Sequence, residues 1–226
     1  LDEEERIKKN TVINSLRAWI KRLQRGRRQD LLRPFRIYDL SPQEIKSRKR
    51  EFGDFEKINK QLIRSTSENN FKLISKNQKL WYAYHSGLNE IKKKWSFDPN
   101  EVWIEQISKM NKNLTIGDFG CGEAVIGHEF GEKRVHSFDL HADSDIVTAC
   151  NIKKVALEND SLDVAVYNLS LMGKDWRELL DEGKRVLRDG GFLFIADTVK
   201  HFDGYLKELP EYLKKLDIHI ISNEPH

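Results

Sequence analysis

Cysteine is scarce in this chain of 226 residues, and long apolar runs are missing. The two cysteines, Cys121 and Cys150, are too few for a disulfide framework or a cysteine-rich zinc site. We therefore expect a reducing, intracellular setting and no bound metal. No uninterrupted apolar stretch approaches the ~20 residues that span a bilayer, so we also expect no membrane partner.

Acidic residues are scarce in the first part of the chain and abundant in the rest. Residues 1–95 hold 24 Lys and Arg against 12 Asp and Glu, whereas residues 96–226 hold 15 against 24. Such a split indicates a basic extension beside an acidic globular unit. A basic extension favours a polyanionic partner, most commonly nucleic acid, although a solvated lysine-rich helical face would give the same composition.

The first 95 residues have helical patterns. Apolar residues recur at helical spacing over 7–23, and the Ser-Pro-Gln-Glu motif at 41–44 is a capping box that opens another helix. Further helices are expected over 54–66 and 77–95, with a polar break at 65–70. A dense basic cluster supplies the candidate RNA contacts, which are Arg22, Arg25, Arg27 and Arg28.

The pattern changes after a second capping motif, Asp-Pro-Asn-Glu at 98–101. Short apolar runs then alternate with helical patterns, as in a parallel sheet covered by helices on both faces. The expected strands are 114–119, 134–138, 146–149, 163–168, 191–197 and 217–222. The helices expected between them lie near 124–130, 174–188 and 203–216.

A glycine-rich turn follows the first of these strands. Asp118 precedes Gly120 and Gly122, and the next glycine is Gly127. This spacing differs from the Gly-x-Gly-x-x-Gly of dinucleotide-binding proteins and looks like the first motif of S-adenosylmethionine enzymes. Glycines here would let the backbone turn sharply and approach a ligand, although an ordinary strand–helix turn has a similar sequence.

Asp139 ends the following expected strand, about 20 residues beyond the turn. An acidic residue at this place can accept the ribose hydroxyls of an adenosine. The same geometry serves a nicotinamide cofactor and S-adenosylmethionine. A strand-end aspartate that caps the next segment is the alternative.

Three stretches together resemble the nucleomethylin family, also called ribosomal RNA-processing protein 8. They are YAYHSGL at 82–88 with Trp95, DFGCG at 118–122 with VHSFDL at 135–140, and DVAVYNLSLMG at 163–173. The last string is much more distinctive than the glycine turn. The resemblance covers about 77–222 and does not extend to residues 1–70.

The resemblance implies a Rossmann-like class I methyltransferase that methylates N1 of an adenine in large-subunit ribosomal RNA. This α/β domain would occupy 77–226, after a basic helical extension at 1–76 or another fused or associated module. The location would be the nucleolus in a eukaryote and the cytoplasm in a prokaryote. Carried over by position, and with the turn residues included, the S-adenosylmethionine contacts would be His85, Asp118, Gly120, Gly122, Asp139, Asn151, Ile152 and Asn168.

Two of these positions depart from the family pattern. The family has Asp where this chain has Asn151, whose amide oxygen can still accept a hydrogen bond from the adenine amine. It has Cys where Asn168 lines the expected methyl-transfer site, so this amide could contact the methionine portion or the target base. The family pattern also continues into a final strand beyond His226, so either the sequence is truncated or this edge is built differently.

No Ser–His–Asp or Cys–His set is visible, and methylation of a ring nitrogen requires no general base. Three alternatives remain open: a catalytically weak S-adenosylmethionine-binding module that tethers RNA, a nicotinamide-dependent oxidoreductase, and a first segment that is the tail of a nucleic-acid motor. A target base must be unstacked to reach the pocket. The candidate stacking surfaces are Trp81, Tyr84, Trp95 and Trp176.

Overall fold

The strands of the computed structural model form one parallel sheet, within the residues that the structure describes, 11–14, 41–198 and 208–223. The sheet has seven strands in the order β4-β3-β2-β5-β6-β1-β7. Its first five strands have the doubly wound order, which starts in the middle and winds to both sides. The strands are β1 (Thr11–Asn14), β2 (Ile116–Phe119), β3 (Val135–Asp139), β4 (Val147–Ala149), β5 (Leu162–Asn168), β6 (Leu187–Ala196) and β7 (His219–Asn223).

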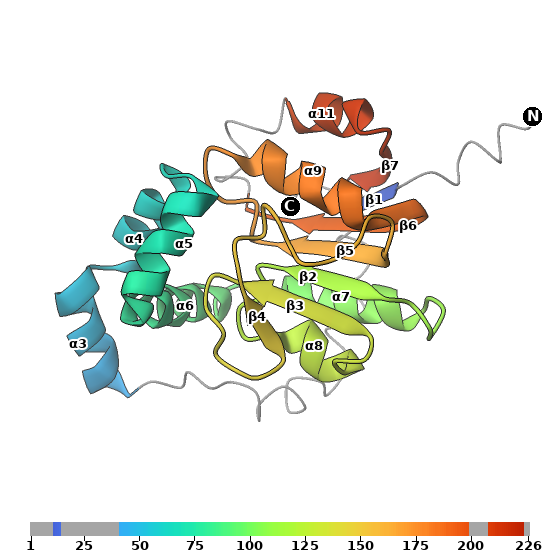
Figure 1. Ribbon diagram of the computed structural model, residues 1–226. Helices are drawn as coiled ribbons and strands as arrows, with labels where there is room; N and C mark the ends of the chain where they lie inside the picture. Colours follow the sequence, from blue (N-terminus) through green and yellow to red (C-terminus); the bar gives the residue numbers. More distant parts are fainter. Residues whose placement is uncertain (1–10, 15–40, 199–207, 224–226) are drawn as a thin grey trace, which may run out of the picture.

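Helices cover both faces of this sheet and one of its ends (Figure 1). α7 and α8 lie on one face, α9 and α11 lie on the other, and α3 to α6 gather beside the carboxyl ends of the strands. None of the helices in the described ranges is both long and apolar enough to cross a membrane. The helices are α3 (Pro42–Phe52), α4 (Phe55–Ile63), α5 (Ser67–Lys76), α6 (Gln78–Lys92), α7 (Pro99–Ser108), α8 (Val125–Phe130), α9 (Trp176–Val186) and α11 (Leu209–Lys215).

The central strand β5 contributes to the core on both sides of the sheet. Its side chains alternate, because successive residues of a strand point to opposite faces. Val164 and Val166 pack with the α7 side, whereas Ala165 and Tyr167 pack with the α9 side, and all four are fully buried. This burial explains why 163–168 reads as a continuous apolar run, as in parallel sheets covered on both faces.

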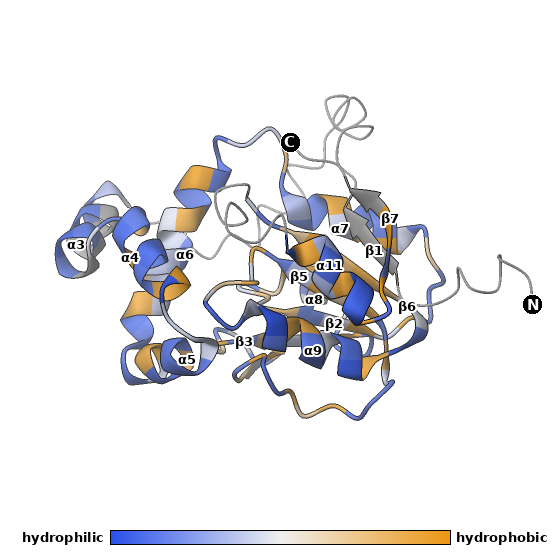
Figure 2. Ribbon diagram, turned by 90° about the horizontal axis from the view of Figure 1, so that it is seen from above, coloured by the Kyte–Doolittle hydropathy of each residue, from blue (hydrophilic) through white to orange (hydrophobic). Residues whose placement is uncertain are grey.

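The helical group α4 to α6 has its own apolar cluster, to which Ile58, Leu62, Ile74 and Trp81 contribute. The outermost helix, α3, is largely hydrophilic (Figure 2). A buried carboxylate fastens the group to the sheet domain. Asp175, just before α9, accepts hydrogen bonds from the Ser67 amide at 2.8 Å and from its hydroxyl at 2.5 Å.

The strands and helices predicted after residue 110 are confirmed within the described residues, with shifts of a few residues at their ends. The first part of the helix predicted over 203–216 lies outside these residues. Two expectations nearer the amino terminus were wrong. Residues 11–14 form a strand between β6 and β7 rather than part of a helix, in keeping with the β-branched run Thr-Val-Ile. The polar break at 65–70 is the start of α5, where Thr66 caps the helix through its side chain. The remainder of the 7–23 prediction lies outside the described residues.

We predict that Asp175→Ala lowers the free energy of unfolding by about 2–3 kcal/mol, because the Ser67 amide and hydroxyl lose a buried charged acceptor. Urea unfolding of the whole protein measures this change. Asp189→Ala is the matched control: its side chain is 83% exposed, so it should change stability by no more than ~0.5 kcal/mol. Equal effects of the two substitutions would contradict the fastening role.

Candidate functional site

The turn after β2 brings bare backbone to the carboxyl edge of the sheet. Gly120 and Gly122 have φ of +78° and +55°, a region that favours glycine. A Cβ atom on Gly120 would lie 2.4 Å from the Ser170 Cβ, and one on Gly122 would lie 2.9 Å from the His85 ring. The turn therefore requires glycine at both positions, and Ser170 and His85 approach it from two sides.

The Asp139 carboxylate faces this turn from the end of β3 and is buried, with 6% of the residue exposed. Its Oδ2 accepts the Gly122 amide at 2.8 Å. Its Oδ1 accepts the Trp81 indole N–H and the Leu140 amide, each at 2.7 Å. Three donors fill three of the roughly four acceptor positions of a carboxylate. Binding of two ribose hydroxyls would thus require at least one of these bonds to be shared or exchanged.

α6 covers the turn with two rings that are in contact and tilted by 37°. The Trp81 ring lies 4.1 Å from the His85 ring, centroid to centroid, so Trp81 contacts both the carboxylate and the imidazole. Burial lowers the pKa of His85 to about 4, an effect that outweighs the nearby Asp139. The imidazole is therefore neutral at pH 7 and adds no positive charge beside the turn.

Asp118 is the second buried carboxyl group of the site, with 2% of the residue exposed. Burial, together with repulsion from Asp139, raises its pKa to about 7. A proton is thus held at this position up to neutral pH, in contrast to an ordinary aspartate.

Asn168, at the end of β5, reaches the site from the third side. Its Nδ2 donates to the Asn100 Oδ1 at 2.5 Å, which fixes the amide against the first turn of α7. Its Oδ1 is buried and has no hydrogen-bond partner among the described residues, and the same holds for the Ser170 hydroxyl. A polar ligand with hydrogen-bond donors would satisfy these two buried oxygen atoms beside the glycine turn.

The loop after β4 completes the edge. The Asn151 Oδ1 accepts the Lys153 amide at 3.0 Å, which leaves one lone pair for another donor. Ile152 is 6% exposed and packs in the core on the α9 side. Gly122 thus contacts both His85 and Asp139. Asn168 and Asn151 lie at the ends of strands that pair with β2 and β3 at the same edge, whereas the Ile152 side chain faces the core.

Most of the candidate stacking rings are core residues. Trp81, Tyr84 and Trp176 are buried and only Trp95 is partly exposed, so the first three do not offer surfaces for an unstacked base. The basic cluster of Arg22, Arg25, Arg27 and Arg28 lies outside the described residues. Within them, no group of three or more His, Cys, Asp or Glu could hold a metal ion.

Sequence reasoning missed two contacts of the site, Trp81 to Asp139 and Asn100 to Asn168. The sequence predicts a stacking surface at Trp81 and a helix start at Asn100, but neither of these contacts. The partners lie 58 and 68 residues apart, and no local pattern in the sequence marks them.

Comparison with known proteins matches residues 41–225 to the Methyltransf_8 family, described as "Hypothetical methyltransferase". The chain belongs to this family. Together with curated relatives of the chain, the match confirms the resemblance to ribosomal RNA-processing protein 8. It begins at residue 41, so it includes the helical group α3 to α6 and corrects the expectation that the resemblance does not extend to residues 1–70.

Curated relatives of this methyltransferase-family chain match about two thirds of it. Over 175 residues, the chain is 34% identical to the "25S rRNA (adenine(645)-N(1))-methyltransferase" of Schizosaccharomyces pombe. The match covers 70% of this chain and 55% of that protein. It is 41% identical over 150 residues to "Ribosomal RNA-processing protein 8" of Drosophila melanogaster, 66% of this chain and 42% of that one. The chain thus spans about half the length of these relatives.

A solved S-adenosylmethionine dependent methyltransferase from Mesorhizobium loti is 25% identical with a TM-score of 0.31, over 41% of this chain and 51% of that one.

The raised pKa of Asp118 predicts a pH dependence of stability. Its carboxyl pKa rises from 3.8 to about 7 on folding, so between these values the unfolded chain loses a proton that the folded protein keeps. The wild type should therefore lose up to ~4 kcal/mol of stability relative to Asp118→Asn as the pH rises from about 4 to about 7. Urea unfolding of both proteins at a series of pH values measures this difference. A difference that stays constant with pH would contradict the assignment.

Proposed function

We propose that this protein transfers a methyl group from S-adenosylmethionine to N1 of an adenine in large-subunit ribosomal RNA. The observation that carries the proposal is the glycine turn with the buried Asp139 carboxylate at the carboxyl edge of a parallel sheet. Ligands of open α/β sheets bind at this edge, next to the switch in strand order. Membership of a methyltransferase family and the name of the Schizosaccharomyces pombe relative support the reaction and the substrate.

Each residue of the site has a proposed role toward the cofactor. Gly120 and Gly122 let the ligand approach the backbone, and Asp139 accepts its ribose hydroxyls. The Asn168 Oδ1, which lacks a partner among the described residues, accepts a hydrogen bond from the methionine amine or from the target base. The remaining proposed contacts are His85, which covers the pocket, Asp118, which lies beside the methionine end, and Asn151 and Ile152, which flank the adenine.

Little acid–base chemistry is required of these side chains. The bound sulfonium supplies an activated methyl group with a neutral leaving group. Adenine N1 carries a lone pair, so the protein has to orient the base in line and exclude water. The neutral His85 and the uncharged Asn168 suit this task, because they add no positive charge next to the sulfonium.

In this proposal the basic extension binds the RNA substrate. Arg22, Arg25, Arg27 and Arg28 would neutralise phosphates and hold the substrate near the site. The division into an extension at 1–76 and a domain at 77–226 stays a prediction, as does an added or associated module. We place the activity where ribosomal RNA is processed, in the nucleolus of a eukaryote or the cytoplasm of a prokaryote.

The decisive test combines binding with turnover. Asp139→Ala should abolish S-adenosylhomocysteine binding in calorimetry and methyl transfer to ribosomal RNA, because the ribose loses its acceptor. Circular dichroism checks that the fold is retained. Asp145→Ala, an exposed aspartate on the following loop, is the control and should bind and turn over as the wild type does.

Two results would contradict the proposal in different ways. Unchanged affinity of Asp139→Ala would refute the ribose role. A wild type that binds the cofactor product but forms no N1-methyladenine on any ribosomal RNA would favour the alternative, an RNA-tethering module with a weak or inactive site. The replacements of the family's Asp by Asn151 and of its Cys by Asn168 make that alternative worth testing.

For the basic cluster, we predict that changing Arg25, Arg27 and Arg28 together to Glu weakens RNA binding and flattens its salt dependence. Each lost phosphate contact should reduce the slope of log affinity against log salt by about 0.7–0.9. Filter binding of a ribosomal RNA fragment at 50–200 mM salt measures the slope, and affinity for S-adenosylhomocysteine serves as the internal control. An unaltered slope would contradict a role of the cluster in binding RNA phosphates.

A further inference from the structure

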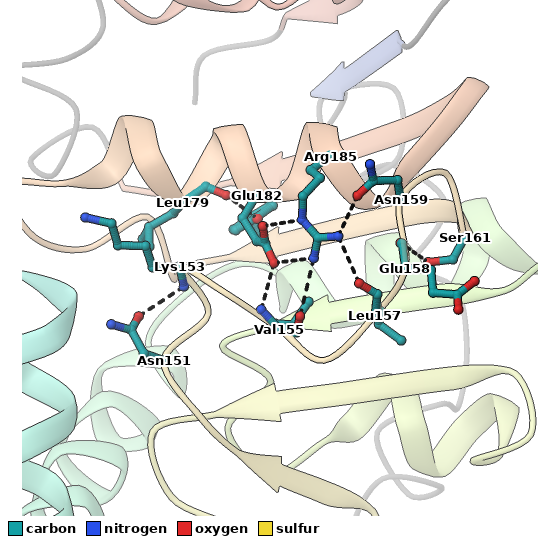
Figure 3. A network of polar contacts seen from close by, with 11 residues as sticks. Asn151, Lys153, Val155, Leu157, Glu158, Asn159, Ser161, Leu179, Glu182 and Arg185 are labelled. Atoms are coloured by element: carbon teal, nitrogen blue, oxygen red, sulfur yellow. Dashed lines mark hydrogen bonds and ion pairs between the residues drawn. The ribbon is translucent and has the colours of Figure 1, made fainter.

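Two neighbouring charged residues of α9, Glu182 and Arg185, hold the loop that follows β4 (Figure 3). The two side chains pair through the Arg185 Nε and Nη2, at 2.7 and 2.6 Å from the carboxylate oxygens. Glu182 accepts the Val155 amide at 2.7 Å, and Arg185 donates to the Leu157 carbonyl at 2.9 Å. The Asn159 Oδ1 accepts a second bond from Arg185, also at 2.9 Å.

The carboxylate of the pair is buried, whereas the Arg185 side chain is 32% exposed. Glu182 is 6% exposed, and burial raises its pKa, but the bonds from Arg185 and Val155 lower it more, so the net shift is downward. The carboxylate therefore stays ionised. A forked guanidinium and an ionised carboxylate form charge-assisted bonds, which are roughly twice as strong as neutral ones.

The loop held in this way has no regular structure between β4 and β5. Its shape therefore depends on side-chain contacts. Ile152 and Val155 anchor the loop in the core on the α9 side. The Glu182–Arg185 pair forms hydrogen bonds to the loop at three points, Val155, Leu157 and Asn159. Asn151 begins the loop, four residues before Val155. Asn151 and Ile152 are the proposed adenine contacts.

We propose that Glu182 and Arg185 are positioning residues for adenine recognition: they hold the loop so that Asn151 meets the adenine amine of the cofactor. This inference rests on the proposed function. The pair contacts the loop at the Val155 and Leu157 backbone and at the Asn159 side chain, so it acts on the adenine through Asn151. A planar fork with several donors is required to reach the carboxylate, the Leu157 carbonyl and Asn159 together, and lysine cannot replace it.

The test compares two ligands that differ at the adenine amine, S-adenosylhomocysteine and S-inosylhomocysteine. The wild type should prefer the adenosyl form. Arg185→Lys, in the full chain, should bind S-adenosylhomocysteine about tenfold more weakly, the loss expected for one well-placed hydrogen bond. Its affinity for the inosyl form should change little, so the discrimination between the two ligands should collapse. A residue with a merely structural role would weaken both ligands alike.

Two further variants keep the test decisive if Arg185→Lys folds poorly. Asn159→Ala removes one exposed contact of the guanidinium, so the fold is kept, and it should reduce the discrimination by about threefold. Arg177→Lys is the matched control on the same helix, because Arg177 pairs with Glu208 and packs over the Trp176 ring. It should behave as the wild type does.

The outcomes separate this inference from the function on which it rests. A wild type that binds neither ligand would overturn both. A wild type that binds and discriminates, with Arg185→Lys and Asn159→Ala doing the same, would overturn the positioning role and leave the proposed function intact. Collapse of the discrimination in these variants, with Arg177→Lys unchanged, would support it.

Discussion

The site depends on the hydrogen bonds of one buried carboxylate, that of Asp139. Its oxygens join three parts of the chain that are far apart in sequence: the indole of Trp81 on α6, the amide of Gly122 in the turn, and the end of β3. A buried carboxylate is tolerated only when donors surround it. The same donors that stabilise it in the folded protein therefore bring α6 over the glycine turn and put His85 in contact with Gly122.

Neighbouring polar groups of the site differ in charge because their surroundings differ. Asp139 has three N–H donors, whereas Asp118 lies beside it, buried, with a pKa raised to about 7. His85 is neutral for the same reason, its burial. The carboxyl edge of the sheet thus holds few full charges, which suits the proposed methyl transfer from a positively charged donor to a neutral ring nitrogen.

Much of the sheet domain could be predicted from the sequence, because its strands are apolar on both faces and α7 begins at a capping motif. The glycine turn and Asp139 could be located for the same reason, since each follows a recognisable strand. Contacts between distant segments could not be predicted in this way. The Glu182–Arg185 spacing of three residues is typical of an ordinary surface pair on a helix, and nothing local connects it to Val155, 27 residues earlier. The strand at 11–14 was missed because four residues carry too little periodicity to outweigh helical neighbours.

The bond between Ser67 and Asp175 has a consequence for dissecting the chain. A fragment that begins at residue 77 would retain Asp175 without its partner, and it would expose the faces of α6 that α4 and α5 cover. Such a fragment would contain every proposed cofactor contact. However, α6, the helix that carries Trp81 and His85, would lack the packing of α4 and α5. The smallest piece that reproduces the intact pocket therefore starts ahead of α4, well before His85, the first of the proposed cofactor contacts.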